Sequence, residues 1–494
     1  MTDSLPNPLD NPCTFVKESS HQQLPHLIVL SFPMQGHITP LFQLSHQLAR
    51  AGPFRITFVV SDHTFSRLSH SSVAASATCP SYPRRSDDAT EPHIRIVSIP
   101  DGLPAHHERD RSFFDQEQAM RGMQLPVQEL LWKLQSDRES AVHFIVSDVF
   151  VTWSREVANR FKLPLLSFYT ANATSCSVLY HGKTLMEEGI IPFKATDWAP
   201  PLRPHEFPPS MQTSDINSPH FRFSLSMFER IHECAGIVLN TVYDLEPRVV
   251  DALRERMAVF TIGPLLLPIG EEDVLPIEPV INFWEEDECE KWLSEQARES
   301  VLYVAFGSIS THTEEQFREM AMGLEECEQP FLWVVRKDAL DGNMLQKALP
   351  EGYMNRIKGR GLIVSWAPQI RVLVHPSVGG FMTHCGWNSI LENLSIAGVP
   401  MICWPQGADQ MVNQRLFVDE WKVGLEVRSG SEGLVHRREV AEVVQHILCS
   451  EDGKECRRRA LDWKRKLRKA VQEGGTTAVS LDRLVQTIQA LSHR

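Results

Sequence analysis

Two side chains in the first half of the sequence could move a proton, namely His37 and Asp148. His37 stands in GHITP after an apolar run at residues 24–32, and Asp148 follows a second apolar run at residues 142–146. A carboxylate bonded to one ring nitrogen of a histidine fixes its tautomer and lets the other nitrogen act as a general base. A turn histidine and a helix N-cap aspartate are the competing interpretations, because the sequence does not show that the two meet. No G-x-S-x-G segment accompanies them, which disfavours hydrolase chemistry.

A second group of polar residues surrounds a glycine-containing turn in the second half. The segment at residues 379–389, GGFMTHCGWNS, runs from a predicted strand into a predicted helix. The unpaired amides and positive dipole end of such a helix favour a diphosphate, although a plain helix cap is the alternative. Glu392, one turn further on, could accept hydrogen bonds from ribose hydroxyls. The side chains expected around the phosphates are His384, Asn388, Ser389 and, from a small loop after residues 301–306, Ser308. Neither G-x-G-x-x-G nor G-x-x-x-x-G-K-[ST] is present, so common dinucleotide and P-loop sites are not indicated.

Short apolar runs that alternate with helical patterns must position these residues. Strands are predicted in the first half at residues 24–32, 55–60, 94–99, 142–146, 165–168 and 236–240, with helices between them at about 111–134 and 154–161. Strands are predicted in the second half at residues 301–306, 331–335, 362–364, 380–383 and 401–403, with a helix at 314–325. This alternation predicts two successive doubly wound parallel sheets, in which ligands bind beyond the carboxyl ends of the strands.

The composition limits the class of protein. The 494 residues exceed what one core usually organises, and 42% of them are hydrophobic and 22% charged, as in globular proteins. A formal net charge of -13 argues against nucleic acid or an anionic membrane as the main partner. The ten cysteines form no C-x-x-C pair and no metal-ligand cluster, which is typical of reduced thiols in a cytoplasmic protein. No apolar segment reaches the roughly 18 residues of a membrane span.

The same patterns divide the chain into five parts. We predict a disordered leader at residues 1–23, a first domain at 24–250, a linker at 251–280, a second domain at 281–455 and C-terminal helices at 456–494 that pack back on the first domain. The last part carries the basic runs RRR, KRK and RK opposite an apolar stripe. A solvated basic face is the favoured interpretation of these runs, and a membrane or partner patch is the alternative.

Taken together, these residues resemble the plant family 1 UDP-glycosyltransferases. Residues 366–410, WAPQIRVLVHPSVGGFMTHCGWNSILENLSIAGVPMICWPQGADQ, are similar to the family's signature box for the nucleotide sugar. The resemblance extends to GHITP, IPDGLP, IVSDVF, SFYTAN, IGPLL, VLYVAFGS and the EGG near Gly474, so that it covers nearly the whole chain after residue 24. It implies a GT-B fold, in which two Rossmann-like domains face each other across a cleft, with the acceptor mostly in the first and the donor mostly in the second.

The resemblance also implies roles for individual residues. His37 would be the general base and Asp148 its partner. Trp366 would stack on uracil, with the Ala367 backbone and Gln369 near the base and ribose. Glu392 would hold the ribose, and the diphosphate would lie against His384, Asn388, Ser389 and Ser308. The sugar hydroxyls would be read by Trp387, Asp409, Gln410 and Thr170. Because the box ends in Gln410, the resemblance favours UDP-glucose as the co-substrate, and it implies neither a cofactor nor a metal.

One feature departs from the family pattern. Six steps separate Glu392 from Gly398, where the usual box has five, so the helix after the diphosphate loop carries one extra residue. From Gly398 to Gln410 the usual spacing returns. We expect the helix end to absorb the extra residue, with an effect on the orientation of Glu392 that the sequence leaves open.

The implied reaction is inverting transfer of a sugar, most simply glucose, to a hydroxyl of a small apolar acceptor by a cytoplasmic monomer. Flavonoids, other phenolics, terpenoids and hormones fit as acceptors. A C-glucosyltransferase acting on a phenolic ring carbon, another UDP-sugar enzyme such as an epimerase, and a non-catalytic binding module are the alternatives. The acceptor pocket is expected from loops at residues 81–91, 105–114 and 189–212. The aromatic residues that could line this pocket, or equally belong to the core, are Phe113, Phe114, Phe150, Trp153 and Phe193.

Overall fold

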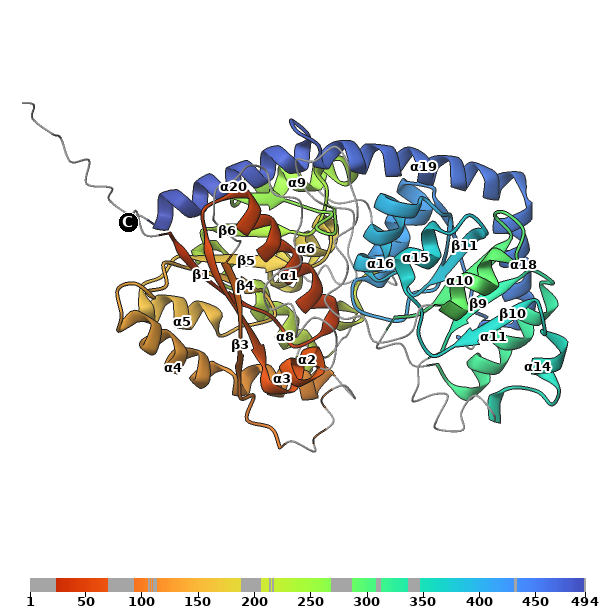
Figure 1. Ribbon diagram of the computed structural model, residues 1–494, viewed down its shortest axis with the longest axis horizontal. Coiled ribbons are helices and arrows are strands. Elements are labelled where there is room, and N and C mark those ends of the chain that lie inside the picture. The colour runs from red at the N-terminus through yellow and green to blue at the C-terminus, as the bar shows by residue number, and fades with distance from the viewer. Residues whose placement is uncertain are drawn as a thin grey trace, which may run out of the picture.

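Two parallel sheets, each covered by helices on both faces, make up the computed structural model (Figure 1). The structure describes residues 24–69, 93–104, 107, 109, 113–187, 206–212, 215, 217–267, 287–307, 312–335, 347–430 and 433–492. Within these residues the arrangement confirms the predicted α/β fold with two doubly wound units. The predicted leader at residues 1–23 lies outside the described part of the chain.

The first sheet has the strand order β3-β2-β1-β4-β5-β6-β7, and every pair is parallel. Its strands are β1 (His26–Leu30), β2 (Arg55–Ser61), β3 (His93–Ile99), β4 (Phe144–Asp148), β5 (Leu165–Tyr169), β6 (Gly236–Leu239) and β7 (Val259–Thr261). Both faces of β1 are buried: Leu27 and Val29 belong to one apolar cluster, and Ile28 and Leu30 belong to another. Burial on both faces explains why the sequence shows continuous apolar runs rather than alternation.

The second sheet has the order β10-β9-β8-β11-β12-β13, again parallel throughout. Its strands are β8 (Val301–Ala305), β9 (Phe331–Val334), β10 (Gly361–Val364), β11 (Val378–Thr383), β12 (Met401–Cys403) and β13 (Gly424–Glu426). In both sheets the strand order reverses beside the strand that opens the unit, β1 or β8. Such a switch point is where open parallel sheets bind ligands.

The helices connect the strands and cover the sheets. In the first unit they are α1 (Gln35–Ala51), α2 (Asp62–Ser69), α3 (Phe113–Gly122), α4 (Gln124–Gln135), α5 (Ser154–Phe161), α6 (Ala173–Tyr180), α7 (Gly182–Glu187), α8 (Pro219–Phe228) and α9 (Pro247–Arg254), with 3-10 turns η3 (Pro209–Met211), η4 (Ile231–Glu233) and η5 (Tyr243–Leu245). In the second unit they are α10 (Asp287–Ser294), α11 (Glu314–Glu326), α14 (Tyr353–Arg356), α15 (Gln369–Val374), α16 (Trp387–Glu392), α17 (Gln410–Arg415) and α18 (Arg437–Cys449), with π-helical turns η6 (Asn393–Ala397) and η7 (Leu416–Glu420). The chain ends in α19 (Glu451–Val471) and α20 (Thr476–Ser492).

Two elements differ from the sequence prediction. Strand β7 lies inside residues 251–280, the range predicted as the linker. The sequence did not reveal this strand because three residues are too few to stand out as an apolar run. The single helix predicted at about 111–134 is divided into α3 and α4. The division follows Gly122, where an added Cβ would lie 1.9 Å from the carbonyl oxygen of Asp101. The helix can approach the loop after β3 this closely only because residue 122 has no side chain.

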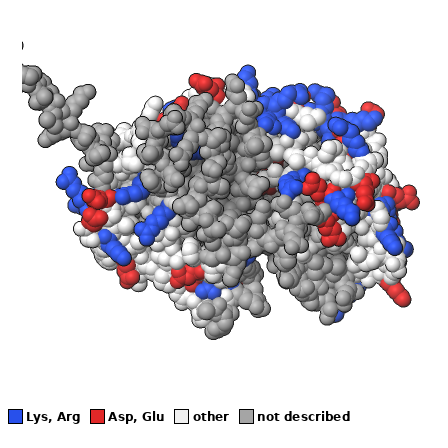
Figure 2. Space-filling view, in the orientation of Figure 1, with Lys and Arg blue, Asp and Glu red and all other residues white. Residues whose placement is uncertain are grey.

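The last two helices join the units along one side of the molecule (Figure 1). Helix α19 packs on η6 and α18 of the second unit, while α20 packs on α1 and β7 of the first. Basic side chains gather over α19 (Figure 2). Several of them pair within the helix, as Arg458 does with Glu455 at 2.7 Å and Asp462 at 2.9 Å. Among the described helices, none combines the length and the apolar character needed to cross a membrane.

Candidate functional site

Neighbouring strands bring His37 and Asp148 together. Strands β1 and β4 pair so that Leu30 lies opposite Ser147, and His37 lies in the first turn of α1 beyond the end of β1. The Nδ1 atom of His37 is 2.7 Å from Oδ2 of Asp148, whose side chain is fully buried. The other carboxylate oxygen accepts a hydrogen bond from the backbone N–H of Phe150 at 2.9 Å. With both oxygens engaged, the carboxylate holds the imidazole in one orientation and one tautomer.

Aromatic rings pack against this imidazole. The ring of Phe150 meets the His37 ring edge-on with centroids 4.5 Å apart, and the ring of Phe32 lies at 5.3 Å. Phe113 and Phe223 extend the group, with their ring centroids 5.1 Å apart. Among the described residues the Nε2 atom of His37 has no hydrogen-bond partner. The imidazole therefore combines an open ring nitrogen with neighbouring aromatic rings.

The predicted acceptor-pocket residues have different positions. Phe113 and Phe150 belong to the aromatic group, and Phe114 lies at its exposed edge, where its ring packs against His220 at 4.5 Å. Trp153 is 8% exposed and donates its indole N–H to the carbonyl of Met120 at 2.9 Å, so it belongs to the core. Phe193 lies outside the described residues, as do the predicted loop at residues 81–91 and parts of those at 105–114 and 189–212.

The glycine-containing turn of the second unit joins β11 to α16. Cys385 has a φ of 64°, and the neighbouring glycines fit closely around the His384 imidazole. A Cβ at Gly386 would lie 2.4 Å from its ring, and one at Gly307 would lie 2.7 Å from it. Burial lowers the pKa of His384 to about 4, so that the ring is neutral at physiological pH. A hydrogen bond between the ring and the backbone of Ala305 opposes this decrease.

Two residues predicted near the ribose, Gln369 and Glu392, form a cluster with Ser389, which is predicted to contact the diphosphate. The amide nitrogen of Gln369 donates to Oγ of Ser389 at 3.0 Å and to Oε2 of Glu392 at 2.5 Å. Burial raises the pKa of Glu392 to about 7, and the hydrogen bond from Gln369 opposes that increase. Trp366 and Ala367 precede α15 in the same region, with Trp366 partly exposed and Ala367 buried. Ser308, the other predicted phosphate contact, lies outside the described residues.

The predicted sugar-contacting residues converge from both units. Burial raises the pKa of Asp409, while its hydrogen bond with Asn413 and the nearby His37 oppose the increase. Gln410 accepts hydrogen bonds through Oε1 from the backbone N–H groups of Gln406 at 2.7 Å and Gly407 at 2.9 Å. This leaves its amide nitrogen for another partner. The indole N–H of Trp387 donates instead to the carbonyl of Asn240 at 2.6 Å, so its side chain does not offer a donor to a sugar.

Asn388 bridges the two units beside His37. Its amide nitrogen donates to the carbonyl of Gly36 at 2.8 Å, and its Oδ1 lies 3.3 Å from the amide nitrogen of Asn240. The hydroxyl of Thr170 donates to the same Gly36 carbonyl at 2.9 Å. Residues predicted to hold the diphosphate and the sugar therefore contact the turn that carries the imidazole.

The extra residue after Glu392 falls in a π-helical turn. The N–H of Gly398 donates to the carbonyl of Asn393 at 2.7 Å, an i→i+5 bond, and Gly398 has a φ of 73°. The buried Asn393 side chain also holds the helix exit through two hydrogen bonds with Val399, at 2.7 and 3.1 Å. Because a π turn holds one more residue than an α turn, it accommodates the insertion without shifting the residues before it.

Sequence reasoning missed three buried amides between the two units, Asn172, Asn240 and Asn413. Asn240 directly follows β6, Asn172 lies three residues after the end of β5, and Asn413 stands one helical turn after Asp409. A polar residue beyond the carboxyl end of a parallel strand is a detectable signal, and SFYTAN and GIVLN both carry it. Their partners, however, come from the other unit and cannot be identified from sequence.

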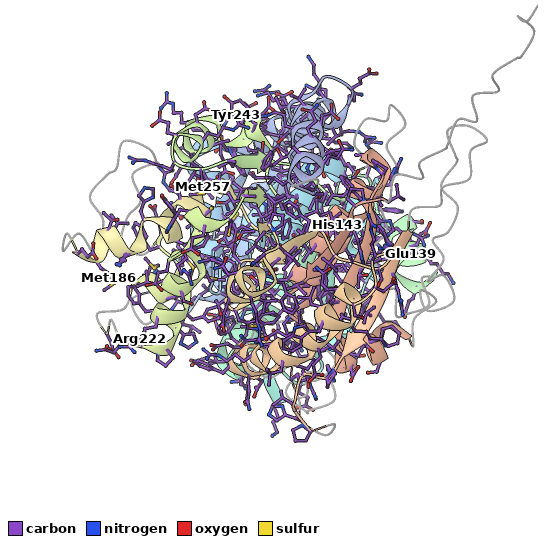
Figure 3. The ribbon with its side chains drawn as sticks, turned by 90° about the vertical axis from the view of Figure 1, so that its left-hand side faces the viewer. Glu139, His143, Met186, Arg222, Tyr243 and Met257 are labelled. Atoms are coloured by element: carbon purple, nitrogen blue, oxygen red, sulfur yellow. The ribbon has the colours of Figure 1, made fainter. Side chains whose placement is uncertain are left out.

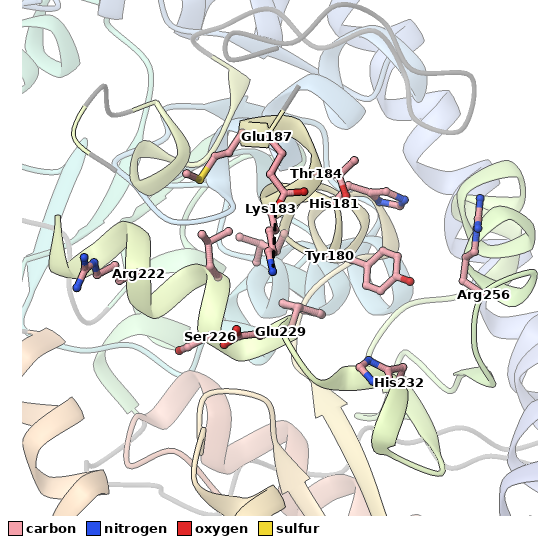
Figure 4. Close-up of a pocket in the computed structure, with 14 residues that line it drawn as sticks. Tyr180, His181, Lys183, Thr184, Glu187, Arg222, Ser226, Glu229, His232 and Arg256 are labelled. Atoms are coloured by element: carbon pink, nitrogen blue, oxygen red, sulfur yellow. Dashed lines mark ion pairs between the residues drawn. The ribbon is translucent and has the colours of Figure 1, made fainter. Parts of the chain in front are cut away.

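A separate cavity of about 770 Å³ lies on the first unit, and none of the predicted site residues lines it. Helix α8 contributes Phe223 to the aromatic group and Arg222 and Ser226 to this cavity. Glu229, which caps α8, also lines the cavity, as do Tyr180 and His232 (Figure 4). Met186 and Arg222 lie at one edge of the molecule, and His143 and Glu139 lie toward the opposite edge (Figure 3).

In the described part of the chain, no three His, Cys, Asp or Glu side chains are grouped closely enough to hold a metal ion.

Comparison with known proteins gives consistent matches. Residues 280–445 match the family model described as UDP-glucoronosyl and UDP-glucosyl transferase. Linamarin synthase 1 of Manihot esculenta is 33% identical over 95% of this chain and 98% of its own length. The (R)-mandelonitrile beta-glucosyltransferase of Prunus dulcis is also 33% identical, over 94% of this chain and 98% of its own length.

Solved structures resemble the chain over nearly its full length. The UGT2 of Phytolacca americana, in complex with UDP-2fluoro-glucose and pterostilbene, matches with a TM-score of 0.76 and 27% identity, covering 94% of this chain and 100% of that one. A UDP-glucose: anthocyanidin 3-O-glucosyltransferase in complex with UDP matches with a TM-score of 0.78 and 26% identity, covering 94% and 99%.

The Asp148 carboxylate should determine which ring nitrogen of His37 carries the proton. In Asp148→Asn the amide oxygen can still accept from the Phe150 N–H, but the amide nitrogen then donates to Nδ1 of His37. We expect the ring proton to move from Nδ1 to Nε2. Nitrogen-15 NMR of the histidine rings measures this change. His26, the buried first residue of β1, is the control because its ring bonds Thr57 at 2.7 Å and does not contact Asp148. An unchanged His37 tautomer in the variant would contradict the assignment.

Proposed function

This chain belongs to the plant family 1 UDP-glycosyltransferases, and we propose that it transfers glucose from UDP-glucose to a hydroxyl of a small apolar acceptor with inversion. The full-length likeness to solved members establishes two Rossmann-like domains of the GT-B type. The observation that carries the proposal is the 2.7 Å contact between Nδ1 of His37 and Asp148, beside the ring of Phe150.

In the proposed reaction His37 is the general base. Its Nε2 takes the proton of the acceptor hydroxyl while the oxygen attacks the anomeric carbon and the bond to the UDP oxygen breaks. Asp148 stabilises the imidazolium that forms. Attack on the face opposite to the leaving group converts an α-linked donor into a β-linked product. The aromatic group excludes water, which would otherwise compete as the acceptor.

The second domain is proposed to hold the donor. Trp366 stacks on uracil, and Gln369 and Glu392 hold the ribose. The amides at the start of α16, the neutral His384 and Ser389 bind the diphosphate and stabilise the charge that develops as UDP leaves. Asn388 and Ser308 are further proposed phosphate contacts. Asp409, Gln410 and Thr170 face the sugar, and Trp387 contributes through its backbone because its indole N–H is engaged.

The acceptor class is proposed from the aromatic group and the relatives. Rings at Phe32, Phe113 and Phe150 favour an apolar acceptor that places one hydroxyl at Nε2 of His37. The similar proteins include an (R)-mandelonitrile beta-glucosyltransferase and a 7-deoxyloganetin glucosyltransferase, which points to small metabolites.

We also propose that the protein acts as a cytoplasmic monomer. Its acceptor domain begins at residue 24 and includes β7, so that the linker starts after Thr261. The donor domain is proposed at residues 281–455 and the terminal helices at 456–494.

Removal of the base should abolish transfer without abolishing donor binding. We expect His37→Ala to lower the rate of glucosyl transfer by at least about 100-fold, the lower range for loss of general-base catalysis, while the affinity for UDP changes little. Mass spectrometry of an acceptor panel with UDP-glucose measures transfer, and calorimetry measures UDP binding. Normal turnover in the variant would exclude His37 from the mechanism. Acid treatment of the product separates O-linked from C-linked glucose.

Donor binding should depend on pH through Glu392. Its pKa of about 7 means that the carboxylate, which accepts the ribose hydroxyls, becomes protonated as the pH falls through 7. We expect the affinity for UDP-glucose to fall by up to about tenfold between pH 8 and pH 6. His384, with a pKa of about 4, does not titrate in this range. Calorimetry on Glu392→Gln provides the control, because the variant should bind more weakly but without this pH dependence; an identical pH profile in both proteins would contradict the role.

The amide nitrogen of Gln410 should contribute more to recognition of the donor sugar than its amide oxygen does. Glu at this position still accepts from the N–H groups of residues 406 and 407 but cannot donate to a sugar hydroxyl. We expect Gln410→Glu to raise the KM for UDP-glucose by about tenfold, the effect of one hydrogen bond, with unchanged thermal stability. Gln410→His, which restores a donor, should shift the balance toward UDP-galactose. Unchanged donor kinetics in both variants would remove Gln410 from sugar recognition.

A further inference from the structure

A hydrogen bond between two buried amide side chains crosses the boundary between the two domains. Asn172 precedes α6 in the first domain and Asn413 lies in α17 of the second, and both side chains are fully buried. The amide nitrogen of Asn172 donates a hydrogen bond to Oδ1 of Asn413. In a dry environment such a bond is stronger than in water, and an unpaired amide there is costly.

The surrounding contacts fix the orientation of both amides. Oδ1 of Asn172 accepts from the backbone N–H of Ser175 at 2.7 Å, the N-cap bond of α6, so its nitrogen must point toward Asn413. The nitrogen of Asn413 donates to the carbonyl of Cys385 at 2.9 Å, so its oxygen must point toward Asn172. Neither amide can be reversed without losing a buried hydrogen bond.

Asn413 holds two parts of the donor site. The same amide nitrogen that bonds Cys385 also donates to Oδ2 of Asp409 at 2.8 Å. Cys385 lies in the diphosphate turn and has a left-handed backbone, and Asp409 is the carboxylate that faces the sugar in the proposed function. One amide therefore ties the phosphate turn to the sugar-facing carboxylate, while its oxygen is held from the opposite domain.

We propose that Asn172 and Asn413 are positioning residues that orient Asp409 toward the donor sugar only when the two domains are in contact. Neither residue touches the donor. Asn172 acts through Asn413, and Asn413 acts through Asp409. The proposal rests on the proposed function, because it assigns Asp409 to the sugar.

Two substitutions separate this role from the N-cap role of Asn172. Ser and Asp are as good as Asn at an N-cap, so both variants retain the bond from Ser175. Asn172→Ser loses the bond to Asn413, and Asn172→Asp in addition places a carboxylate against Oδ1 of Asn413. We measure the association constants for UDP-glucose and for UDP by calorimetry. The constant for UDP-glucose divided by the constant for UDP isolates the contribution of the sugar, and we call this quotient the ratio. The ratio should fall by about two- to tenfold in Asn172→Ser and further in Asn172→Asp.

A double-mutant cycle with Asn413→Ser tests the route. If Asn172 acts only through Asn413, Asn172→Ser should not lower the ratio further in that background. A wild-type ratio in Asn172→Asp, with an unchanged melting temperature, would overturn the proposal. Asp409→Asn, measured alongside, separates the two failures. If Asp409→Asn leaves the ratio unchanged, the proposed contact of Asp409 with the sugar is wrong. If Asp409→Asn lowers the ratio but the Asn172 variants do not, only the positioning role of Asn172 and Asn413 is excluded.

Discussion

The hydrogen bond between His37 and Asp148 depends on the pairing of β1 with β4. Because these strands are neighbours and parallel, both of their carboxyl ends lie at one edge of the sheet, and residues 111 positions apart in sequence come within 2.7 Å. The carboxylate is fully buried and its second oxygen is occupied by the Phe150 N–H, so it has no freedom to turn away. Burying an aspartate is tolerated only where its oxygens are bonded. The proposed catalytic nitrogen of His37, Nε2, is thus oriented by the contact that Nδ1 makes with Asp148.

The proposed base is half of the candidate site, and the other half belongs to a different sheet. One apolar cluster includes residues of both sheets, from Ile28 and Ile145 to Val301 and Phe381, so the two domains share a continuous core. Above this core, the contacts between domains are polar and directional: Asn388 reaches Gly36, Trp387 reaches Asn240, and Trp421 donates to the carbonyl of Leu245 at 3.3 Å. Apolar packing brings the two domains together. These side-chain hydrogen bonds then fix the relative position of the domains.

The sequence predicted the fold well because the fold depends on local patterns, and the same patterns placed the candidate polar residues at the carboxyl ends of the strands. Buried parallel strands produce continuous apolar runs, and the polar residues that follow them, such as His37 and His384, lie at the ligand-binding edge. It failed where the partner is distant or the element is short. Nothing near Trp387 or Trp153 indicates that their indole N–H groups are engaged by Asn240 and Met120. The three-residue strand β7 and the break at Gly122 likewise depend on tertiary contacts, the latter on a carbonyl 21 positions earlier in the chain.

The π turn after Glu392 shows how a donor site tolerates a change in chain length. An α-helix lengthened by one residue would rotate everything after it by about 100°, and would carry β12 and the residues beyond it out of register. Here the extra residue is confined to Asn393–Ala397, where one wider turn and the left-handed Gly398 return the chain to β12. Glu392 precedes the wider turn and keeps its bond to Gln369, while Asp409 and Gln410 follow β12, whose register with β11 is regular. The residues proposed to contact the ribose and the sugar therefore lie on opposite sides of the irregular segment and are unaffected by it, because each group follows the end of a different strand.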